Sequence, residues 1–183
     1  MRRIEQKLLP IARKWAGNIP VWEARRAGID DSALRHWAKD NPAVQNTGYG
    51  IYTWFCEDSR IDWNYSEVAR LVGQAGPGAY LWGPSALELM EVGDVMPVEC
   101  SIAVPTRRRI RAGVRWITGK KARHSTPSDY RGIPLQSMSD ALVDSMPLLE
   151  MDKQTSVLED ALRRFPELEP LICELRREYG LEA

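Results

Sequence analysis

Two short helical segments joined by a glycine constrain the fold of this chain most strongly. The stretch from Ala24 to Asp40 reads ARRAGIDDSALRHWAKD. Gly28 is expected to form the tight turn, because glycine adopts a positive φ without strain. Asp30 or Asp31 is expected to cap the helix that follows, since a carboxylate there accepts the free amides of the first turn. The stretch therefore predicts two helices joined by a tight turn, with Leu34, Trp37 and Ala38 on the inward face of the second.

The residues on either side complete a recognisable order of elements. Apolar residues recur at helical spacing over residues 3–16, although Pro10 removes a backbone donor and is expected to kink or divide that helix. Pro20 suits the first turn of a second helix that runs to Arg26. Residues 43–55, AVQNTGYGIYTWF, predict a β-hairpin that turns at NTG. Three helices and a hairpin together predict a winged helix-turn-helix, in which the hairpin is the wing.

Charge is distributed unevenly along a chain whose 25 basic and 25 acidic residues cancel. Residues 1–55 carry nine Lys and Arg against five Asp and Glu, a balance of +4. Eight basic residues and no acid lie between Ser101 and Ser128, whereas eleven acids and five bases follow from Met138 onward. A basic head, a basic middle and an acidic tail indicate two different kinds of partner.

The remainder of the chain predicts an α+β fold with a small sheet and several helices. Extended segments are expected at VECSIAVP, GVRWITG and YRGIPLQS. Helices are expected near residues 65–72, after Gly83, from Ser139 to about Ser145 with Ser137 or Ser139 as the cap, and over residues 153–164 and 168–179.

The sequence offers no combination of residues typical of an enzyme. The two histidines, His36 and His124, are not in a metal-ligand spacing, and there is no Walker loop or GxSxG motif. The three cysteines form no CxxC pair, which favours reduced thiols. We therefore expect no catalytic residues, no metal and no cofactor, and a cytoplasmic location, because no apolar run is long enough for a signal peptide or a membrane span.

The second helix of the pair is the strongest candidate for a functional surface. Binding to duplex DNA needs cations near phosphates and side chains that reach base edges from a helix in the major groove. Arg35 is expected to read a base, because a guanidinium can bond guanine bidentately. The alternative is that these residues form an ordinary solvated face, and two aspartates at the start of the helix would repel phosphate. The candidate DNA-binding residues are Ser32, Arg35, His36 and Lys39 from this helix, Arg2, Arg3 and Lys14 from the first helix, and Gln45, Asn46 and Thr47 at the wing tip.

The basic segment TRRRIRAGVRWITGKKARH has three interpretations. It is a second DNA contact, a surface for an acidic protein partner, or the charged edge of a hairpin, where cations prevent aggregation between sheets. The residues concerned are Arg107, Arg108, Arg109, Arg111, Arg115, Lys120, Lys121 and Arg123.

Four segments in the same order resemble the AbiEi family of antitoxins. GYGIYTWF resembles the wing of that family, and YLWGPSALELMEVGDVMP resembles its serine-alanine-leucine helix followed by a loop and a proline. CSIAVPTRRRIR is similar to its strand, proline and arginine stretch, and YRGIPLQSMSDALVD to its GIP strand and the aspartate-containing helix after it. The resemblance covers about the whole chain.

The resemblance implies an antitoxin of a type IV toxin–antitoxin system. Residues 1–56 would be a winged helix-turn-helix DNA-binding domain that represses its own operon at inverted repeats in the promoter, two molecules occupying two half-sites. Residues 57–183 would be a C-terminal antitoxin domain that counters an AbiEii-like nucleotidyltransferase toxin, with or without stable contact. The rival hypothesis is a stand-alone winged-helix regulator with a ligand-sensing second domain, which an apolar pocket lined by Trp82 and Trp116 would favour.

Overall fold

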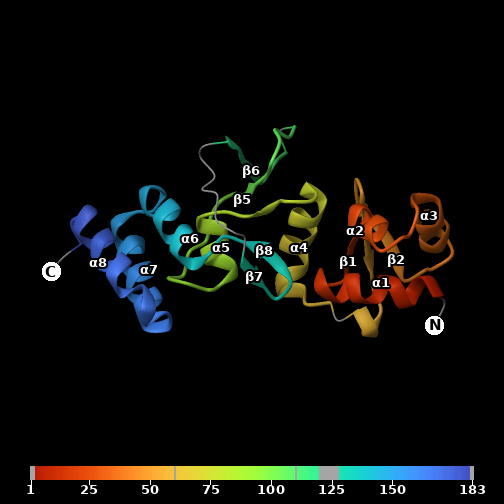
Figure 1. Ribbon diagram of the computed structural model, residues 1–183, viewed down its shortest axis with the longest axis horizontal. Coiled ribbons are helices and arrows are strands. Elements are labelled where there is room, and N and C mark those ends of the chain that lie inside the picture. The colour runs from red at the N-terminus through yellow and green to blue at the C-terminus, as the bar shows by residue number, and fades with distance from the viewer. Residues whose placement is uncertain (1–2, 60, 110, 120–127, 182–183) are drawn as a thin grey trace. The chain divides into compact units, whose positions relative to one another are not determined.

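The computed structural model describes residues 3–59, 61–109, 111–119 and 128–181. The chain divides into two compact units. Unit 1 comprises Met1–Ala79 together with Arg131–Ile133, and unit 2 comprises Tyr80–Tyr130 and Pro134–Ala183. Both are mixtures of helices and strands (Figure 1), which confirms the predicted α+β class at this level.

Three helices in unit 1 agree with the sequence pattern. They are α1 (Arg3–Lys14), α2 (Val21–Arg26) and α3 (Asp31–Lys39). The helix α1 continues through Pro10, so of the two expected outcomes, a kink or a division, the division does not occur. Pro10 and Gln6, whose carbonyl loses its helical donor, are both exposed, so water can replace the missing hydrogen bond.

A three-stranded sheet completes the first part of unit 1. Its strands β1 (Asn18–Pro20), β2 (Val44–Gly48) and β3 (Ile51–Trp54) run in the order β1-β3-β2, and both pairs are antiparallel. The hairpin β2–β3 was predicted, whereas β1 was not. The predicted turn at NTG is wrong, because the chain turns at Tyr49–Gly50 with Gly50 at φ +70°. The register shift between Asn46 and Gly48 leaves Thr47 as the extra residue of a β-bulge within β2.

Tryptophans fix α3 against its neighbours. Trp37 of α3 is 3% exposed, and its ring meets Trp54 of β3 edge to face at a centroid distance of 5.1 Å. Its indole nitrogen also donates to Glu5 of α1 over 3.3 Å. The helix is therefore anchored on both the hairpin and α1 by its inward face, as the positions of Leu34 and Trp37 predicted.

A fourth helix, α4 (Trp63–Ala75), packs on the same sheet after the short 3₁₀ turn Glu57–Ser59. Gly73 permits the close approach, because a Cβ there would lie 2.8 Å from the Pro20 side chain and 3.3 Å from Trp15. The carbonyl of Gly73 also accepts a hydrogen bond from the indole of Trp22 over 2.7 Å. The first unit therefore extends to Ala79 rather than to the expected boundary at residue 56.

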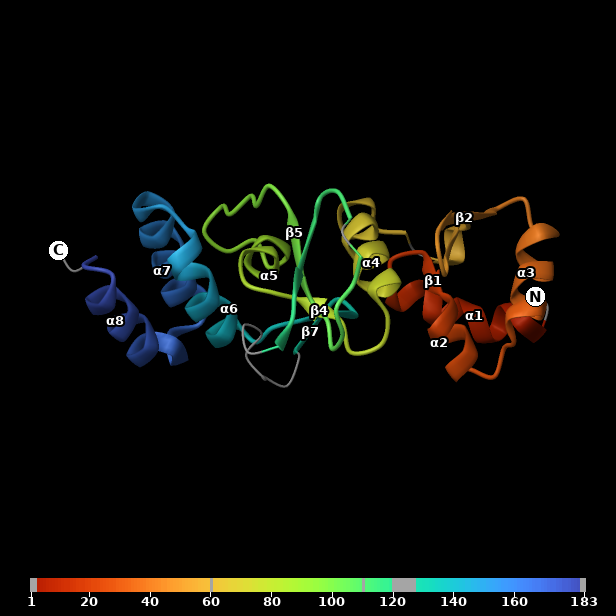
Figure 2. The ribbon, with the colours of Figure 1, turned by 90° about the horizontal axis from the view of Figure 1, so that it is seen from above.

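Unit 2 contains a five-stranded sheet in the order β6-β5-β4-β8-β7 (Figures 1 and 2). Its strands are β4 (Tyr80–Leu81), β5 (Cys100–Ala103), β6 (Val114–Ile117), β7 (Ser128–Tyr130) and β8 (Ile133–Leu135), the last of which begins in unit 1. The short central strand β4 pairs antiparallel with β5 and parallel with β8. It was not predicted, because two residues are too few to produce an alternating pattern.

The helices of unit 2 are joined to this sheet through the helix that packs against β5. The helix α5 (Pro84–Leu89) packs against α6 (Met138–Ser145), whose cap is Ser137, one of the two serines predicted for that position. The 3₁₀ turn Met146–Leu148 leads to α7 (Met151–Arg164), and the 3₁₀ turn Pro166–Leu168 leads to α8 (Glu169–Glu178). Figure 2 shows α6, α7 and α8 following one another. None of the described helices is long and apolar enough to cross a membrane.

Candidate nucleic-acid interface

The outward face of α3 carries three of the predicted DNA-binding side chains. Arg35, His36 and Lys39 are exposed, while Leu34 and Trp37 are buried on the opposite face. The guanidinium of Arg35 bonds to the backbone carbonyl of Asp31 through Nε over 3.2 Å, which leaves its terminal nitrogens free to reach outward. Arg35 and Lys39 are one helical turn apart and therefore project from the same side.

The two aspartates at the start of α3 are both engaged in the fold. Asp30 is the N-cap, and its carboxylate accepts hydrogen bonds from the backbone amides of Ser32 and Ala33, each over 2.9 Å. Asp31 forms a bidentate ion pair with Arg25 at the end of α2. The predicted repulsion of phosphate by Asp31 is therefore reduced, because a guanidinium neutralises its charge.

Hydrogen bonding favours the charged form of each of these groups. The hydroxyl of Ser32 and the amide of Ala33 lower the pKa of Asp30. The hydrogen bond from Arg25 lowers the pKa of Asp31, and Asp31 in turn raises the pKa of Arg25. Both carboxylates thus stay ionised, and the helix start stays capped, at any pH near neutrality.

The hydroxyl of Ser32, another candidate DNA-binding residue, is engaged within the fold. It donates to Asp30 Oδ1 over 2.6 Å, so its only proton already has an acceptor. The hydroxyl oxygen can still accept, but a phosphate needs donors. The role of Ser32 in this structure is to complete the cap of α3.

The candidate DNA-binding residues Arg3 and Lys14 lie at opposite ends of α1. Arg3 is exposed in the first turn, beside a shallow pocket that Lys7, Gly28 and Ala33 also line, so it lies near the start of α3. Lys14 lies at the far end of α1, where its ammonium pairs with Glu23 over 3.1 Å and covers the ring of Trp15. The structure therefore brings Arg3, but not Lys14, to α3. Arg2 lies outside the described residues.

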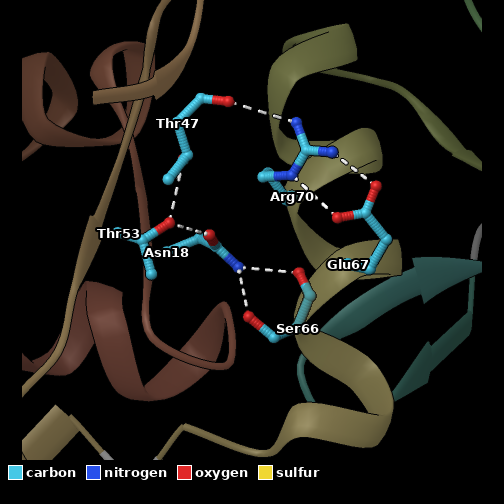
Figure 3. Close-up of polar contacts among 6 residues, drawn as sticks. All are labelled: Asn18, Thr47, Thr53, Ser66, Glu67 and Arg70. Atoms are coloured by element: carbon cyan, nitrogen blue, oxygen red, sulfur yellow. Dashed lines mark hydrogen bonds and ion pairs between the residues drawn. The ribbon is translucent and has the colours of Figure 1, made fainter. Parts of the chain in front are cut away.

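The hairpin residues are not at the tip, where they were predicted. Gln45, Asn46 and Thr47 lie along the edge strand β2. Gln45 and Asn46 are exposed, but the hydroxyl of Thr47 bonds to that of Thr53 over 2.9 Å on the covered face (Figure 3). The residue at the tip is Tyr49, whose side chain is 94% exposed, and the sequence analysis did not select it.

The basic segment lies in unit 2, where the described arginines are largely exposed. Arg107, Arg108 and Arg109 follow β5 in an exposed loop, and the carbonyl of Arg109 accepts a hydrogen bond from Trp116 over 2.8 Å. Arg111 is half-buried in a bridge to Val114. Lys120, Lys121 and Arg123 lie outside the described residues.

The interpretation of this segment as a hairpin edge is wrong in one respect. The strands β5 and β6 are parallel, with Cys100 beside Val114 and Ala103 beside Ile117, so the basic loop is a crossover between them. Arg115 does lie exposed on the edge strand β6, where a cation protects the edge. A second DNA contact and an acidic partner both stay open.

The two tryptophans named for a ligand pocket occupy other positions. Trp82 is 7% exposed and packs with Ala103 and Ile117, so it fills the core beside the sheet. Trp116 is half-buried on β6 and bonds to the arginine loop. Neither observation favours a ligand-sensing cavity at these rings.

Removing the cap of α3 tests how firmly the candidate interface is held. Asp30→Ala is expected to lower the melting temperature by about 3 °C, because two amides lose their acceptor. Asp30→Asn keeps an oxygen in place and is expected to lose less. Because the pKa of Asp30 is lowered on folding, its charge stabilises above the ordinary carboxyl range, and that advantage fades as the pH falls through the lowered value. Thermal unfolding of the three proteins at several pH values checks this, and equal melting temperatures throughout would contradict the capping role.

Comparison with known proteins adds no assignment. No model of a known protein family matches the chain, and no curated protein matches it. Within the described ranges, no group of three or more His, Cys, Asp or Glu side chains is placed to hold a metal ion.

Proposed function

We propose that this chain is a DNA-binding antitoxin that represses its own operon and neutralises a nucleotidyltransferase-like toxin. In this proposal α1, α2, α3 and the hairpin act as a winged helix-turn-helix, with α3 in the major groove. The observation that carries it is the outward face of α3. Arg35, His36 and Lys39 are exposed there, while the buried pair Trp37 and Trp54 fixes the helix by its other face.

The local electrostatics of α3 support a DNA-binding role. Arg25 neutralises Asp31, and Asp30 is engaged with backbone amides, so the cations of α3 are not opposed by free carboxylates at its start. Arg3 adds a further exposed cation near the same helix end. A fixed helix that presents Arg35 and Lys39 on one exposed face, with Asp31 paired to Arg25, supports contact with phosphates and base edges.

The antitoxin part of the proposal rests on the family resemblance of the four sequence segments, most of which belong to unit 2. It gives the second unit the task of countering the toxin, and it makes the exposed arginines after β5 a candidate contact for DNA or for an acidic protein surface. It requires no catalytic residue in this chain.

A cellular assay separates the two activities. The chain is co-expressed with the AbiEii-like nucleotidyltransferase toxin that the proposal requires, while a reporter gene measures the activity of the promoter upstream of the chain's own gene. We expect the intact protein to restore growth and silence the reporter. We expect Arg35→Ala/Lys39→Ala to restore growth but to leave the reporter active, because only the DNA contact is removed. Failure of the intact protein to restore growth would contradict the antitoxin role. A reporter that stays active in cells expressing the intact protein would contradict autorepression.

A further inference from the structure

The tip of the hairpin has an unusual combination of a fixed backbone and a free aromatic side chain. Three carbonyls around the turn accept hydrogen bonds from outside the hairpin. The amide of Val21 donates to Gly50 over 2.9 Å, Gln74 Nε2 donates to Tyr49 over 3.1 Å, and Arg70 Nη1 donates to Thr47 over 3.3 Å. The turn is thus held by α2 on one side and by α4 on the other.

The two side chains from α4 are themselves fixed. Arg70 is four residues before Gln74, so both project from one face of the helix. The guanidinium of Arg70 forms a bidentate ion pair with Glu67, with Nε 2.9 Å from Oε2 (Figure 3). Its side chain is only 19% exposed, so Arg70 serves the fold rather than an external phosphate.

A buried network holds α4 against the sheet beneath this contact. Asn18 of β1 is fully buried, and its amide donates to the carbonyl of Ser66 over 2.9 Å. Its oxygen accepts from the hydroxyl of Thr53 over 2.7 Å, and Thr53 bonds in turn to Thr47 (Figure 3). Because the side chains of Asn18, Thr53 and Thr47 are linked by these hydrogen bonds, α4 and the hairpin are fixed together.

Tyr49 is the side chain that this arrangement presents. It is 94% exposed, and no described ring stacks on it, in contrast to the exposed Trp63, which stacks on Phe55. A side chain exposed to this degree contributes little to packing, and its ring and hydroxyl are accessible to a partner.

We propose that Tyr49 is the DNA contact of the hairpin, with its ring against a deoxyribose and its hydroxyl donating to a phosphate, and that Arg70 and Gln74 are positioning residues for it. This inference rests on the proposed function, because it names a further contact of the same DNA-binding unit. Tyrosine side chains are among the common donors to the DNA backbone. Fixing the loop before binding lowers the entropy cost of the contact.

The test measures binding of the full chain to a labelled duplex of its own upstream DNA at several salt concentrations. Tyr49→Ala is expected to weaken binding about tenfold, with an unchanged melting temperature and an unchanged salt dependence, because tyrosine carries no charge. Tyr49→Phe, which keeps the ring, is expected to lose less. Trp63→Ala is the matched control and is expected to bind like the intact protein.

The role of the positioning residues has its own readout. Arg70→Met is expected to weaken binding by a similar factor, and Arg70→Met/Tyr49→Ala to be no weaker than Tyr49→Ala alone, because both changes remove one contact. Additive losses would overturn the positioning role. Unchanged binding by Tyr49→Ala, when Arg35→Ala/Lys39→Ala abolishes it, would overturn the inference and leave the proposed function intact. No specific binding by the intact protein would overturn both.

Discussion

Replacing Arg35 and Lys39 together with alanine is expected to weaken specific DNA binding by about two orders of magnitude, the largest functional effect we predict. Both side chains are exposed on the outward face of α3, one helical turn apart. Arg35 has its terminal nitrogens available for a base edge, and Lys39 is an exposed cation suited to a phosphate. A bidentate base contact and a phosphate contact are therefore lost at once.

The single variants divide this loss into two kinds. Arg35→Ala is expected to relax discrimination between the specific duplex and one with a scrambled sequence. Lys39→Ala is expected to weaken binding to both duplexes alike. It should also reduce the slope of log affinity against log salt concentration by about 1, because one phosphate contact disappears. Fluorescence anisotropy titrations with both duplexes measure these effects. Full specific binding by the double variant would contradict a contact through α3, and the arginines that follow β5 would be the next residues to test.

Trp37→Ala is expected to produce the largest loss of stability, about 3–5 kcal/mol in the free energy of unfolding. Trp37 is 3% exposed, packs edge to face on Trp54 and donates to Glu5. The change opens a cavity among α1, α3 and the hairpin, and it also removes the hydrogen bond that Glu5 accepts from the indole nitrogen. Since α3 loses its anchor, DNA binding is expected to fall with stability.

Chemical denaturation followed by circular dichroism checks this prediction. Trp63→Ala is the control, because Trp63 is 71% exposed and its loss leaves no cavity. We expect the control to unfold within about 1 kcal/mol of the intact protein. Similar losses for the two variants would show that the anchoring of α3 by Trp37 is incorrect.

Local signals in the sequence were sufficient for the elements that contain the candidate interface. Gly28 and Asp30 placed the turn and the start of α3, because both act within a few residues of themselves. The apolar spacing of Leu34 and Trp37 identified the inward face and thereby the outward one. The same kind of local signal, a serine cap at Ser137 or Ser139, placed the start of α6 to within two residues.

The features that the sequence analysis missed depend on contacts between distant residues. The strand β1 is three residues long and ends in proline, so only its pairing with β3 defines it. The turn at Tyr49–Gly50 competes with NTG, and the bulge at Thr47 together with the bonds from α4 settles the choice. The ion pair of Arg25 with Asp31 depends on the angle between two helices, which spacing alone does not give.

The extent of the first unit was also hidden from a reading of local patterns. The segment after residue 56 is polar and reads as a connector. Buried hydrogen bonds from Asn18 to Ser66, 48 residues apart, make the helix beyond it part of the same unit. A single buried asparagine gives no periodic signal, so this boundary follows from the structure alone.

The most direct test of the account is the salt dependence of binding by the intact protein to its own upstream DNA, beside a scrambled duplex of equal length. The account predicts at least about a thousandfold preference for the specific duplex. It also predicts that the logarithm of the affinity falls steeply and linearly with the logarithm of the salt concentration. Equal affinities for the two duplexes at every salt concentration would contradict the claim that α3 reads DNA.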